Sequence, residues 1–381
     1  MNFKAGILYR LSLLLAGAAA LSSCARLIYD YEGNCDDSVE IYLKYDYNIE
    51  RADMRADHVG YALVYAVDEN GHIAARSEVS EPEIHDKNSV VKFNGLQPGR
   101  YTFTAIAMQK PYEVCAAGTG ARFRATLPAN GAAIADLNVR LDRNANANEF
   151  GLHQVEAPAQ GLDTLWIGQS ITAGGIVVPE VKDQRGNVIR DTVSLVRDTK
   201  YLNLTLHQID KPAEVYDTDF EVTIVDNNGY LAWDNALLPD DNLVYSPHAS
   251  WTTSMSEKGV VYMSEEEAAK APADDPIKER AAHFELSFSR LLYYATASEG
   301  SNATLCVRTR DRGALVVEIN LAYFLAIGRD AYSVANYSAQ EYLDREYHYN
   351  LDFFLDKVGW KFVNIKVNTT PWARRIYNQT L

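Results

Sequence analysis

Cysteine is scarce in this chain, with four residues in 381, and no two of them are spaced as Cys-x-x-Cys. This scarcity argues against a zinc ribbon and against a small scaffold held together by many disulfides. The eight histidines are scattered, and no pair of them has the spacing of metal ligands. The sequence therefore predicts no metal site.

The motifs of the common enzyme classes are also missing. There is no His-Glu-x-x-His, no Gly-x-Ser-x-Gly, no glycine-rich phosphate loop and no dinucleotide fingerprint. We therefore expect no catalytic residue and no cofactor, and predict that the protein is not an enzyme. An envelope hydrolase stays open as an alternative, because the paired carboxylates of glycoside hydrolysis need no local motif.

Positive charge is in deficit. Acidic residues number 51 against 36 basic ones, which gives a formal net charge of −15. Nucleic acid is therefore not an expected partner, and anionic lipid headgroups would repel the chain. The densest acidic stretches, Asp240-Asp241 and Asp274-Asp275, lack the alternating oxygen ligands of a calcium loop. We expect them to be solvated loop charges, with calcium binding as the alternative.

Long apolar runs are missing from the chain after its first part, which predicts no later membrane span. At the start, Lys4 and Arg10 are followed by an apolar stretch at 11–20, and two serines then precede Cys24. This order predicts a secretory signal, and its last part resembles the lipobox of bacterial lipoproteins. The resemblance implies that residues 1–23 are removed and that the Cys24 thiol carries the lipid that holds the exported protein on a membrane. The alternatives are an ordinary signal peptide with a chance cysteine and a single N-terminal anchor helix.

Three cysteines remain after Cys24, namely Cys35, Cys115 and Cys306. In an oxidising envelope Cys35 and Cys115 can pair, which would hold the N-terminal segment on the first domain. The alternative is that both are buried free thiols. Cys306 lies in an apolar stretch and is expected at a buried strand position.

The body of the chain has the two-residue period of β-strands. Apolar or aromatic residues fill the odd positions of 39–47, which predicts a half-buried strand. Residues 59–67 are apolar on both faces and predict a central strand. The Asp-Glu-Asn-Gly sequence at 68–71 favours a tight hairpin, and residues 96–99 predict a turn before a strand at 101–107.

The same pattern occurs twice. Residues 64–74 align without gaps on residues 222–232, and each stretch has an apolar strand, an Asp-x-Asn-Gly turn and a returning strand. An alternating strand precedes each of them, at 39–47 and at 201–209. We infer two related β-sandwich domains, with chance similarity of hairpins as the alternative.

The expected organisation follows from these patterns. It consists of a signal peptide at 1–23, a tether at 24–37, an N-terminal β-sandwich domain at 38–180 and a C-terminal β-sandwich domain at 181–381. The boundary should fall between residues 144 and 187, where Gly, Asn and Ala are frequent and the alternation is weak. A chain of this length suits two or three domains.

Two short helices interrupt the strands of the second half. Residues 264–270 begin with a capping box, and residues 338–345 begin with the same Ser-x-x-Glu pattern. The clearest strand of the chain follows at 347–355, and residues 360–367 are its expected partner. Residues 372–381 are a candidate edge strand at the end of the chain.

Several of these stretches together resemble one known family. They are the lipobox ending at Cys24 with Cys35 close behind it, the aromatic strand Tyr42-Leu43-Lys44-Tyr45-Asp46-Tyr47-Asn48, the turns at 68–71 and 96–101, the block Gln340-Glu341-Tyr342-Leu343-Asp344-Arg345-Glu346, and the stretches at 363–368 and 372–376. Together they resemble the FimB/Mfa-like anchor subunits of type V fimbriae, the outer-membrane pili of Bacteroidales. The insert Thr369-Thr370-Pro371 departs from the pattern, which has a tighter Asn-Gly-Trp there.

The resemblance implies a mainly β fold of two tandem transthyretin-like β-sandwich domains with short helical insertions. It also implies a lipid-anchored subunit that attaches the base of a fimbria to the outer membrane and terminates or regulates its length. Pilin and accessory subunits are the implied partners, because subunits of such pili join when one chain's terminal strand completes a neighbour's sheet. Residues 39–47 and 372–381 are the candidate strand edges.

Two other functions stay open. A fimbrial tip or accessory adhesin would lose the segment around Cys24 together with its lipid. A surface glycan-binding lipoprotein would present Trp or Tyr side chains on one platform. Trp233 is expected to pack in the interior, whereas the sequence does not decide the roles of Trp166, Trp251 and Trp372.

Overall fold

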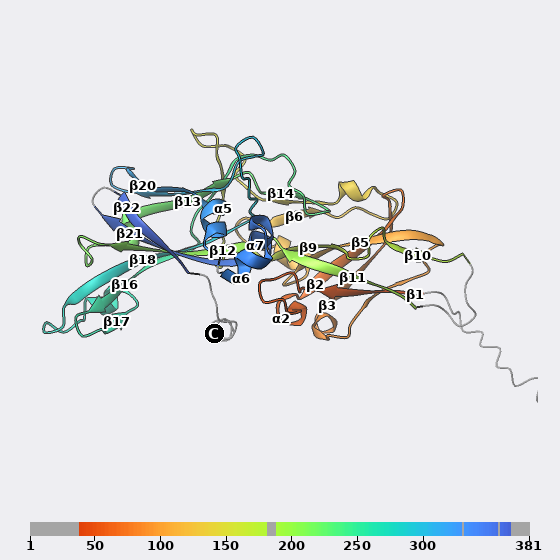
Figure 1. The fold of residues 1–381 in the computed structure, drawn as a ribbon, viewed down its shortest axis with the longest axis horizontal. Coiled ribbons are helices and arrows are strands. Elements are labelled where there is room, and N and C mark those ends of the chain that lie inside the picture. Colours follow the sequence, from red (N-terminus) through yellow and green to blue (C-terminus); the bar gives the residue numbers. More distant parts are fainter. Residues whose placement is uncertain (1–37, 181–187, 330, 357–358, 367–381) are drawn as a thin grey trace, which may run out of the picture.

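The computed structural model describes residues 38–180, 188–329, 331–356 and 359–366. These residues form an elongated molecule in which the two halves of the chain follow each other along the long axis (Figure 1). Strands make up four sheets, and short helices connect them. The predicted fold class, mainly β with tandem β-sandwiches and short helical insertions, is confirmed.

The largest sheet has eight strands, most of them from the N-terminal half. In spatial order they are β3 (Ile73–Ser80), β2 (Tyr61–Asp68), β5 (Gly99–Met108), β9 (Leu165–Ser170), β11 (Val188–Arg197), β1 (Ser38–Lys44) and β4 (Val91–Asn94), with β10 (Ile176–Val178) paired to one end of β5. β1 runs parallel to β11 and antiparallel to β4. The two outer strands, β3 and β4, come close to each other, so the sheet curls around a core of its own.

The curled sheet buries apolar side chains on both of its faces. The first seven residues of β2 are all buried, and successive side chains of a strand point to opposite faces. Ala62 and Val64 belong to the core inside the curl, whereas Leu63 and Tyr65 belong to a second core that continues into the C-terminal half. The predicted central strand at 59–67 is therefore confirmed.

Three further sheets complete the described structure. The six-stranded sheet contains β17 (Val261–Tyr262), β16 (Ala249–Ser256), β18 (Ile277–Phe288), β12 (Lys200–Gln208), β21 (His348–Asp356) and β22 (Gly359–Lys366). The five-stranded sheet contains β20 (Leu315–Asn320), β19 (Thr304–Thr309), β13 (Phe220–Asp226), β15 (Leu243–Tyr245) and β8 (His153–Val155). The three-stranded sheet contains β14 (Tyr230–Ala232), β7 (Asn138–Leu141) and β6 (Phe123–Thr126).

The helices of the described residues are all short. They are α2 (Arg55–His58), α3 (Tyr112–Ala116), α4 (Glu265–Ala268), α5 (Leu321–Ile327), α6 (Ala331–Asn336) and α7 (Ala339–Arg345), with 3-10 turns η2 (Glu83–His85), η3 (Ile134–Asp136) and η4 (Asp217–Asp219). The serine caps expected from the sequence are present, because Ser264 Oγ accepts the Glu267 N–H of α4 and Ser338 Oγ accepts the Glu341 N–H of α7. Both predicted helices are confirmed.

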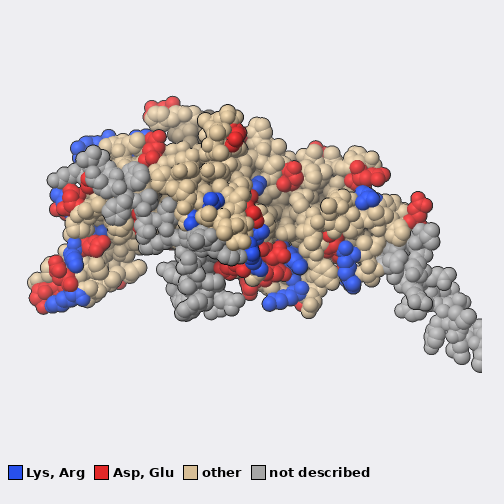
Figure 2. All heavy atoms as spheres, viewed as in Figure 1, with Lys and Arg blue, Asp and Glu red and all other residues tan. Residues whose placement is uncertain are grey.

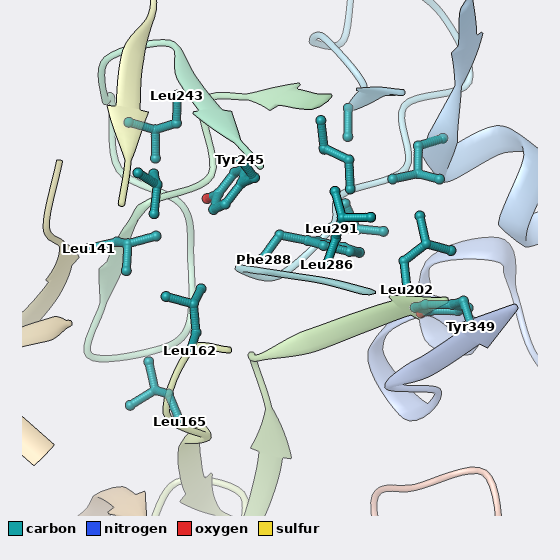
Figure 3. Packing of buried hydrophobic residues seen from close by; sticks show 14 of the residues in the cluster. Leu141, Leu162, Leu165, Leu202, Leu243, Tyr245, Leu286, Phe288, Leu291 and Tyr349 are labelled. Carbon is teal, nitrogen blue, oxygen red and sulfur yellow. The ribbon is translucent and has the colours of Figure 1, made fainter. Parts of the chain in front are cut away.

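One large apolar core connects the sheets of the two halves. It takes side chains from β2 near the start of the described chain to β21 near its end. In Figure 3, Leu141, Leu162 and Leu165 of the N-terminal half lie around the same region as Leu202 and Phe288 of the C-terminal half. Because burial of apolar area is the main favourable term in folding, the two halves depend on each other for stability.

Two short strands cross between the halves. β8, from the N-terminal half, pairs with β15, and β14, from the C-terminal half, pairs with β7. The hairpin expected at 222–232 is therefore wrong, since β13 and β14 flank the turn but lie in different sheets. The physical reason is Asn228, whose buried side chain donates to the carbonyl oxygens of Ser289 and Arg290 and accepts from the Tyr245 hydroxyl.

The first Asp-x-Asn-Gly turn does form the predicted hairpin, between β2 and β3. Asp68 accepts the N–H groups of Asn70 and His72, and Gly71 adopts a φ of +79°. A hairpin turn of this kind needs a residue that tolerates positive φ, and glycine does so at no steric cost. Two similar sequences thus form different structures, and the proposed domain duplication stays a prediction.

The predicted domain boundary near residue 180 also stays a prediction. β11 lies C-terminal to that boundary, yet it pairs with β1 and β9 of the largest sheet. Only two residues, Asp198 and Thr199, separate the end of β11 from the start of β12 in the six-stranded sheet. The chain therefore passes from one half to the other at this point.

Candidate functional site

Cys24, Cys35 and the candidate edge strand at 372–381 lie outside the described residues. Lipidation and the disulfide therefore stay predictions. Cys115, the expected partner of Cys35, lies in α3 and is buried, and its thiol donates to the Lys110 carbonyl oxygen at 3.6 Å. Burial, followed by the nearby carboxylate of Asp163, raises the pKa of this thiol. A thiol with a raised pKa is a poor nucleophile at neutral pH, so its surroundings favour a structural role.

The other candidate strand edge, at 39–47, forms a strand that ends at Lys44, earlier than expected, and this strand does not lie at the margin of its sheet. β1 has β11 on one side and β4 on the other. The side chains of Val39, Ile41 and Leu43 are at most 4% exposed. The alternating pattern correctly predicted one buried face, but it carries no information about how many neighbouring strands the backbone has.

The described sheets do have longer edges elsewhere. Among the described strands at the sheet margins, β3, β20 and β22 are the longest, whereas β4, β6, β8, β14 and β17 have four residues or fewer. β20 and β22 come close to each other at one end of the molecule (Figure 1). β3 exposes Arg76 and Glu78, and charged side chains on an edge disfavour pairing with another chain.

A cluster of buried charged side chains joins the two halves where β11 passes into β12. The guanidinium carbon of Arg197, at the end of β11, lies 3.8 Å from the ring centre of Tyr347, 5.4 Å from that of Tyr201 and 5.6 Å from that of Trp166. Arg197 is 5% exposed. A desolvated cation between aromatic rings is held by cation–π attraction, so this arginine connects strands of both halves.

Lys200, at the start of β12, is fully buried. Its ammonium donates to the carbonyl oxygens of Asp344 and Glu346, each at 2.9 Å. Burial lowers the pKa of Lys200, and the negative charge of Asp344 opposes that shift. The lysine therefore uses its donors to hold the end of α7 against β12, and its position gives no access to a ligand.

Asp198 and Arg290 complete this cluster. The Asp198 carboxylate is fully buried and accepts a hydrogen bond from Asn235 Nδ2 at 2.8 Å. Burial raises the pKa of Asp198, while the positive charge of Arg290 lowers it in part. Arg290 forms a bidentate ion pair with Asp344, at 2.7 and 2.8 Å. Such paired geometry is needed for buried charges to be tolerated.

α7 also holds the loop that follows β1. The guanidinium carbon of Arg345 lies 4.0 Å from the Tyr47 ring centre, and its Nη1 donates to the Asn48 carbonyl oxygen at 3.3 Å. Glu341 binds the same guanidinium at Nε, at 2.9 Å. The block at 340–346, one of the stretches that carry the family resemblance, therefore lies where the C-terminal part of the described chain contacts the loop after β1.

Two surface cavities lie outside this cluster. One, of about 320 Å³, has three arginines in its wall, Arg124, Arg140 and Arg143, and each of them forms an ion pair with an aspartate. The other, of about 630 Å³, has a wall of tyrosine, threonine and asparagine side chains around Tyr294 and Tyr323. The paired arginines leave little net charge for an anionic ligand.

Asp240 and Asp275 are not the solvated charges that the sequence suggested. The Asp240 side chain is fully buried between Arg140 and Arg143, with Arg143 Nη1 at 2.5 Å. Asp275 is 3% exposed and accepts hydrogen bonds from Ser256 Oγ and from a backbone N–H. Within the described parts of the chain, no three His, Cys, Asp or Glu side chains are grouped as metal ligands.

The tryptophans do not form one common platform in the described structure. Trp166 is fully buried, and Trp233 is half-buried against the large core, in the turn after β14. Trp251, on β16, stacks on His283 with ring centres 5.1 Å apart. Trp372 lies outside the described residues.

In the same described ranges, no helix is long and apolar enough to cross a membrane.

Charges of both signs are interspersed on one face of the molecule. On the face shown in Figure 2, basic and acidic side chains lie next to one another, with wide uncharged areas between them. The net charge of −15 is therefore not gathered into one large acidic area on this face. The functional features that the structure adds to the sequence analysis are the buried cluster and the arrangement of strand edges.

The chain is similar to known proteins in sequence and in fold. A family model of the fimbrillin-A associated anchor proteins Mfa1 and Mfa2 matches residues 31–378. No curated protein matches the sequence.

Solved structures share the fold. A candidate adhesin from Bacteroides thetaiotaomicron is 25% identical, with a TM-score of 0.65 over 87% of this chain and 96% of that one. A candidate polysaccharide-binding protein from the same organism is 24% identical, with a TM-score of 0.60 over 87% of this chain and 99% of that one. The fimbrial anchor protein Mfa2 from Porphyromonas gingivalis is 13% identical, with a TM-score of 0.55 over 84% of this chain and 91% of that one.

Proposed function

The chain belongs to the family of fimbrillin-A associated anchor proteins, and on that premise we propose that it attaches the base of a fimbria to the outer membrane and ends the growth of the polymer. As a member of this family it is a fimbria-associated subunit of the cell surface. The match over residues 31–378 is the single observation that carries the proposal. A structural role agrees with it, and we propose no catalytic step.

The membrane attachment is assigned to a lipid on Cys24. The basic start, the apolar stretch and the small residues before this cysteine support the assignment. Residues 24–37 can reach at most about 45 Å when extended, at about 3.3 Å per residue. That length allows β1 to stand clear of the lipid headgroups, from which the acidic chain is repelled.

The contact with pilin is assigned to strand addition, in which a strand of one subunit pairs with the sheet of the next. β1 lies between β4 and β11, and this position supports the proposal that the subunit ends the growth of the fimbrial polymer. Along the first four residues of β1, which pair with β4 as well as with β11, the described backbone offers a neighbour's strand no free partner while β1 occupies this place. Because the lipid is attached upstream of β1, a lipid-bearing subunit keeps this strand. Residues 372–381 remain the candidate segment for pairing with pilin.

The test compares wild type with Cys24→Ala in the native cell, and Cys306→Ala is the matched control because this cysteine lies in β19, far from the signal. Fimbrial polymer is measured in the cell-bound and culture-fluid fractions, together with its length. We expect Cys24→Ala to release polymer into the fluid or to leave its length unregulated, and Cys306→Ala to behave as wild type.

Polymer that stays attached with unchanged length in Cys24→Ala would refute the anchor function. Mass spectrometry of the mature N-terminus then tests the alternative. A tip or accessory subunit would have lost Cys24 and its lipid in the assembled fimbria, whereas an anchor keeps both.

A further inference from the structure

We infer that β1 and β11 form a mechanical clamp that resists unfolding when the chain is pulled from its N-terminus. The source of the load rests on the proposed anchoring function, since a subunit held by a lipid on one side and by a fibre on the other is under tension. The clamp itself rests on strand geometry, and it can be measured on the isolated protein. The two claims can therefore fail separately.

The backbone pairing of β1 is extensive for a strand at the start of a domain. All seven of its residues pair with β11, from Ser38 opposite Val188 to Lys44 opposite Ser194. Its first four residues also pair with β4 on the other side. The strand that leads to the proposed lipid is therefore held by hydrogen bonds along its whole length.

The direction of these strands decides how a load acts on them. β1 and β11 are parallel, and β11 and β12 follow each other along the long axis of the molecule (Figure 1). The end of β11 passes directly into β12 through the buried cluster around Arg197 and Lys200. A pull on the N-terminal end of β1, opposed by a pull beyond β12, therefore shears β1 along β11. In shear the hydrogen bonds share the load and must break nearly together.

Side-chain burial adds to this resistance. Sliding β1 along β11 would move Val39, Ile41 and Leu43 out of the core inside the curled sheet. Tyr45, directly after the strand, is fully buried and packs edge-on against Trp166 with ring centres 5.8 Å apart. Interiors are closely packed and tolerate little displacement, so the side chains and the backbone resist the same movement.

A different pulling direction should meet much less resistance. β4 is antiparallel to β1, with Asn94 opposite Ser38. A pull between the N-terminus and the turn after β4 therefore acts at one end of both strands and peels them apart, and hydrogen bonds then break one after another. The structure thus predicts that the force needed to detach β1 depends on the pulling direction, although the same strand is loaded in both cases.

The experiment is single-molecule force spectroscopy on the mature chain, with one handle at its N-terminus. The second handle is placed either at Lys211, which is exposed and follows β12, or at Gln97, which is exposed and follows β4. We expect the force that detaches β1 to be at least threefold higher for the Lys211 handle than for the Gln97 handle. Equal forces in the two geometries would overturn the inference.

Two variants separate mechanical strength from stability. Glu40 has Arg190 on one side and Lys92 on the other, so Glu40→Pro removes a backbone donor within the clamp. Leu351→Ala removes a fully buried side chain of β21, outside it. With the Lys211 handle, Glu40→Pro should halve the detachment force or lower it further. Leu351→Ala should lower the urea midpoint of unfolding and leave the detachment force unchanged. A detachment force that falls in Leu351→Ala but not in Glu40→Pro would refute the clamp.

Discussion

Replacing Asp226 by Asn should stabilise the protein at neutral pH. Asp226 ends β13 and is 8% exposed. Its carboxylate accepts the Asn227 N–H at 2.8 Å. Among the residues that the structure describes, no lysine or arginine contributes to the pKa of Asp226. The nearby Tyr245 hydroxyl donates instead to Asn228. Burial raises the pKa of Asp226 from 3.8 to about 7, which the single hydrogen bond from Asn227 opposes only in part.

The direction of the Asp226 pKa shift determines how the stability of the protein changes with pH. Because the pKa is raised on folding, the folded protein holds this proton more tightly than the unfolded chain. The stabilisation that comes from protonation is complete below about pH 4 and is lost as pH rises through about 7. A shift of about three units at about 1.4 kcal/mol per unit gives an upper limit of about 4 kcal/mol. Since Asn must also be desolvated, we expect Asp226→Asn to gain about 2 kcal/mol at pH 8 and almost nothing at pH 4.

Urea unfolding of wild type and variant between pH 4 and pH 8 tests this expectation. The difference between their free energies of unfolding should grow with pH and level off above about 7. Asp68→Asn is the matched control, because Asp68 has the same place in the first Asp-x-Asn-Gly turn but its side chain is 33% exposed. It should give no comparable gain. A loss of stability in Asp226→Asn at pH 8, or a difference independent of pH, would contradict the argument.

Three further substitutions test the core and the buried cluster by urea unfolding. Arg290→Met leaves the buried carboxylate of Asp344 without its bidentate partner, so the free energy of unfolding should fall by about 3 kcal/mol; a neutral effect would mean that water reaches Asp344. Leu351→Ala opens a cavity in the large core and should cost about 3 kcal/mol, unless the neighbouring strands close in. Gly60→Ala places a Cβ 2.0 Å from the Gln109 carbonyl oxygen and should cost about 2 kcal/mol or more; an unchanged midpoint would show that the backbone moves away freely.

The sequence predicted strands well where one or both faces are buried. The alternation at 39–47 and at 347–355 led to β1 and β21, and the continuous apolar stretch at 59–67 led to β2. Each of these signals is local, because side chains of a strand alternate whatever its neighbours are. The α5 helix was missed although it has a local signal: Asn320 caps its first turn by accepting the Tyr323 N–H, and an apolar run follows.

Strand neighbours were not predictable in the same way. β1 is central because β4 and β11, from distant parts of the chain, lie on its two sides. Likewise, the turn at Asp226 resembles the hairpin turn at Asp68, but distant carbonyl oxygens bind its Asn228 and send the next strand to another sheet. Turn chemistry fixes a few dihedral angles, whereas pairing depends on contacts that no short pattern contains.

The buried cluster shows why part of the candidate site could only be found in the structure. A four-residue stretch, Arg-Asp-Thr-Lys at 197–200, has the composition of an exposed turn, yet its charged side chains are buried. Their partners, such as Trp166 and Asp344, are far away in sequence. The block at 340–346 carried the family resemblance without showing its role, which is to hold α7 against β12 and against the loop after β1. Charges are seldom buried without partners, and the contacts of this block reach both β12 and the loop after β1. The block therefore joins the two halves into one unit and can transmit a load from β1 to the C-terminal sheets.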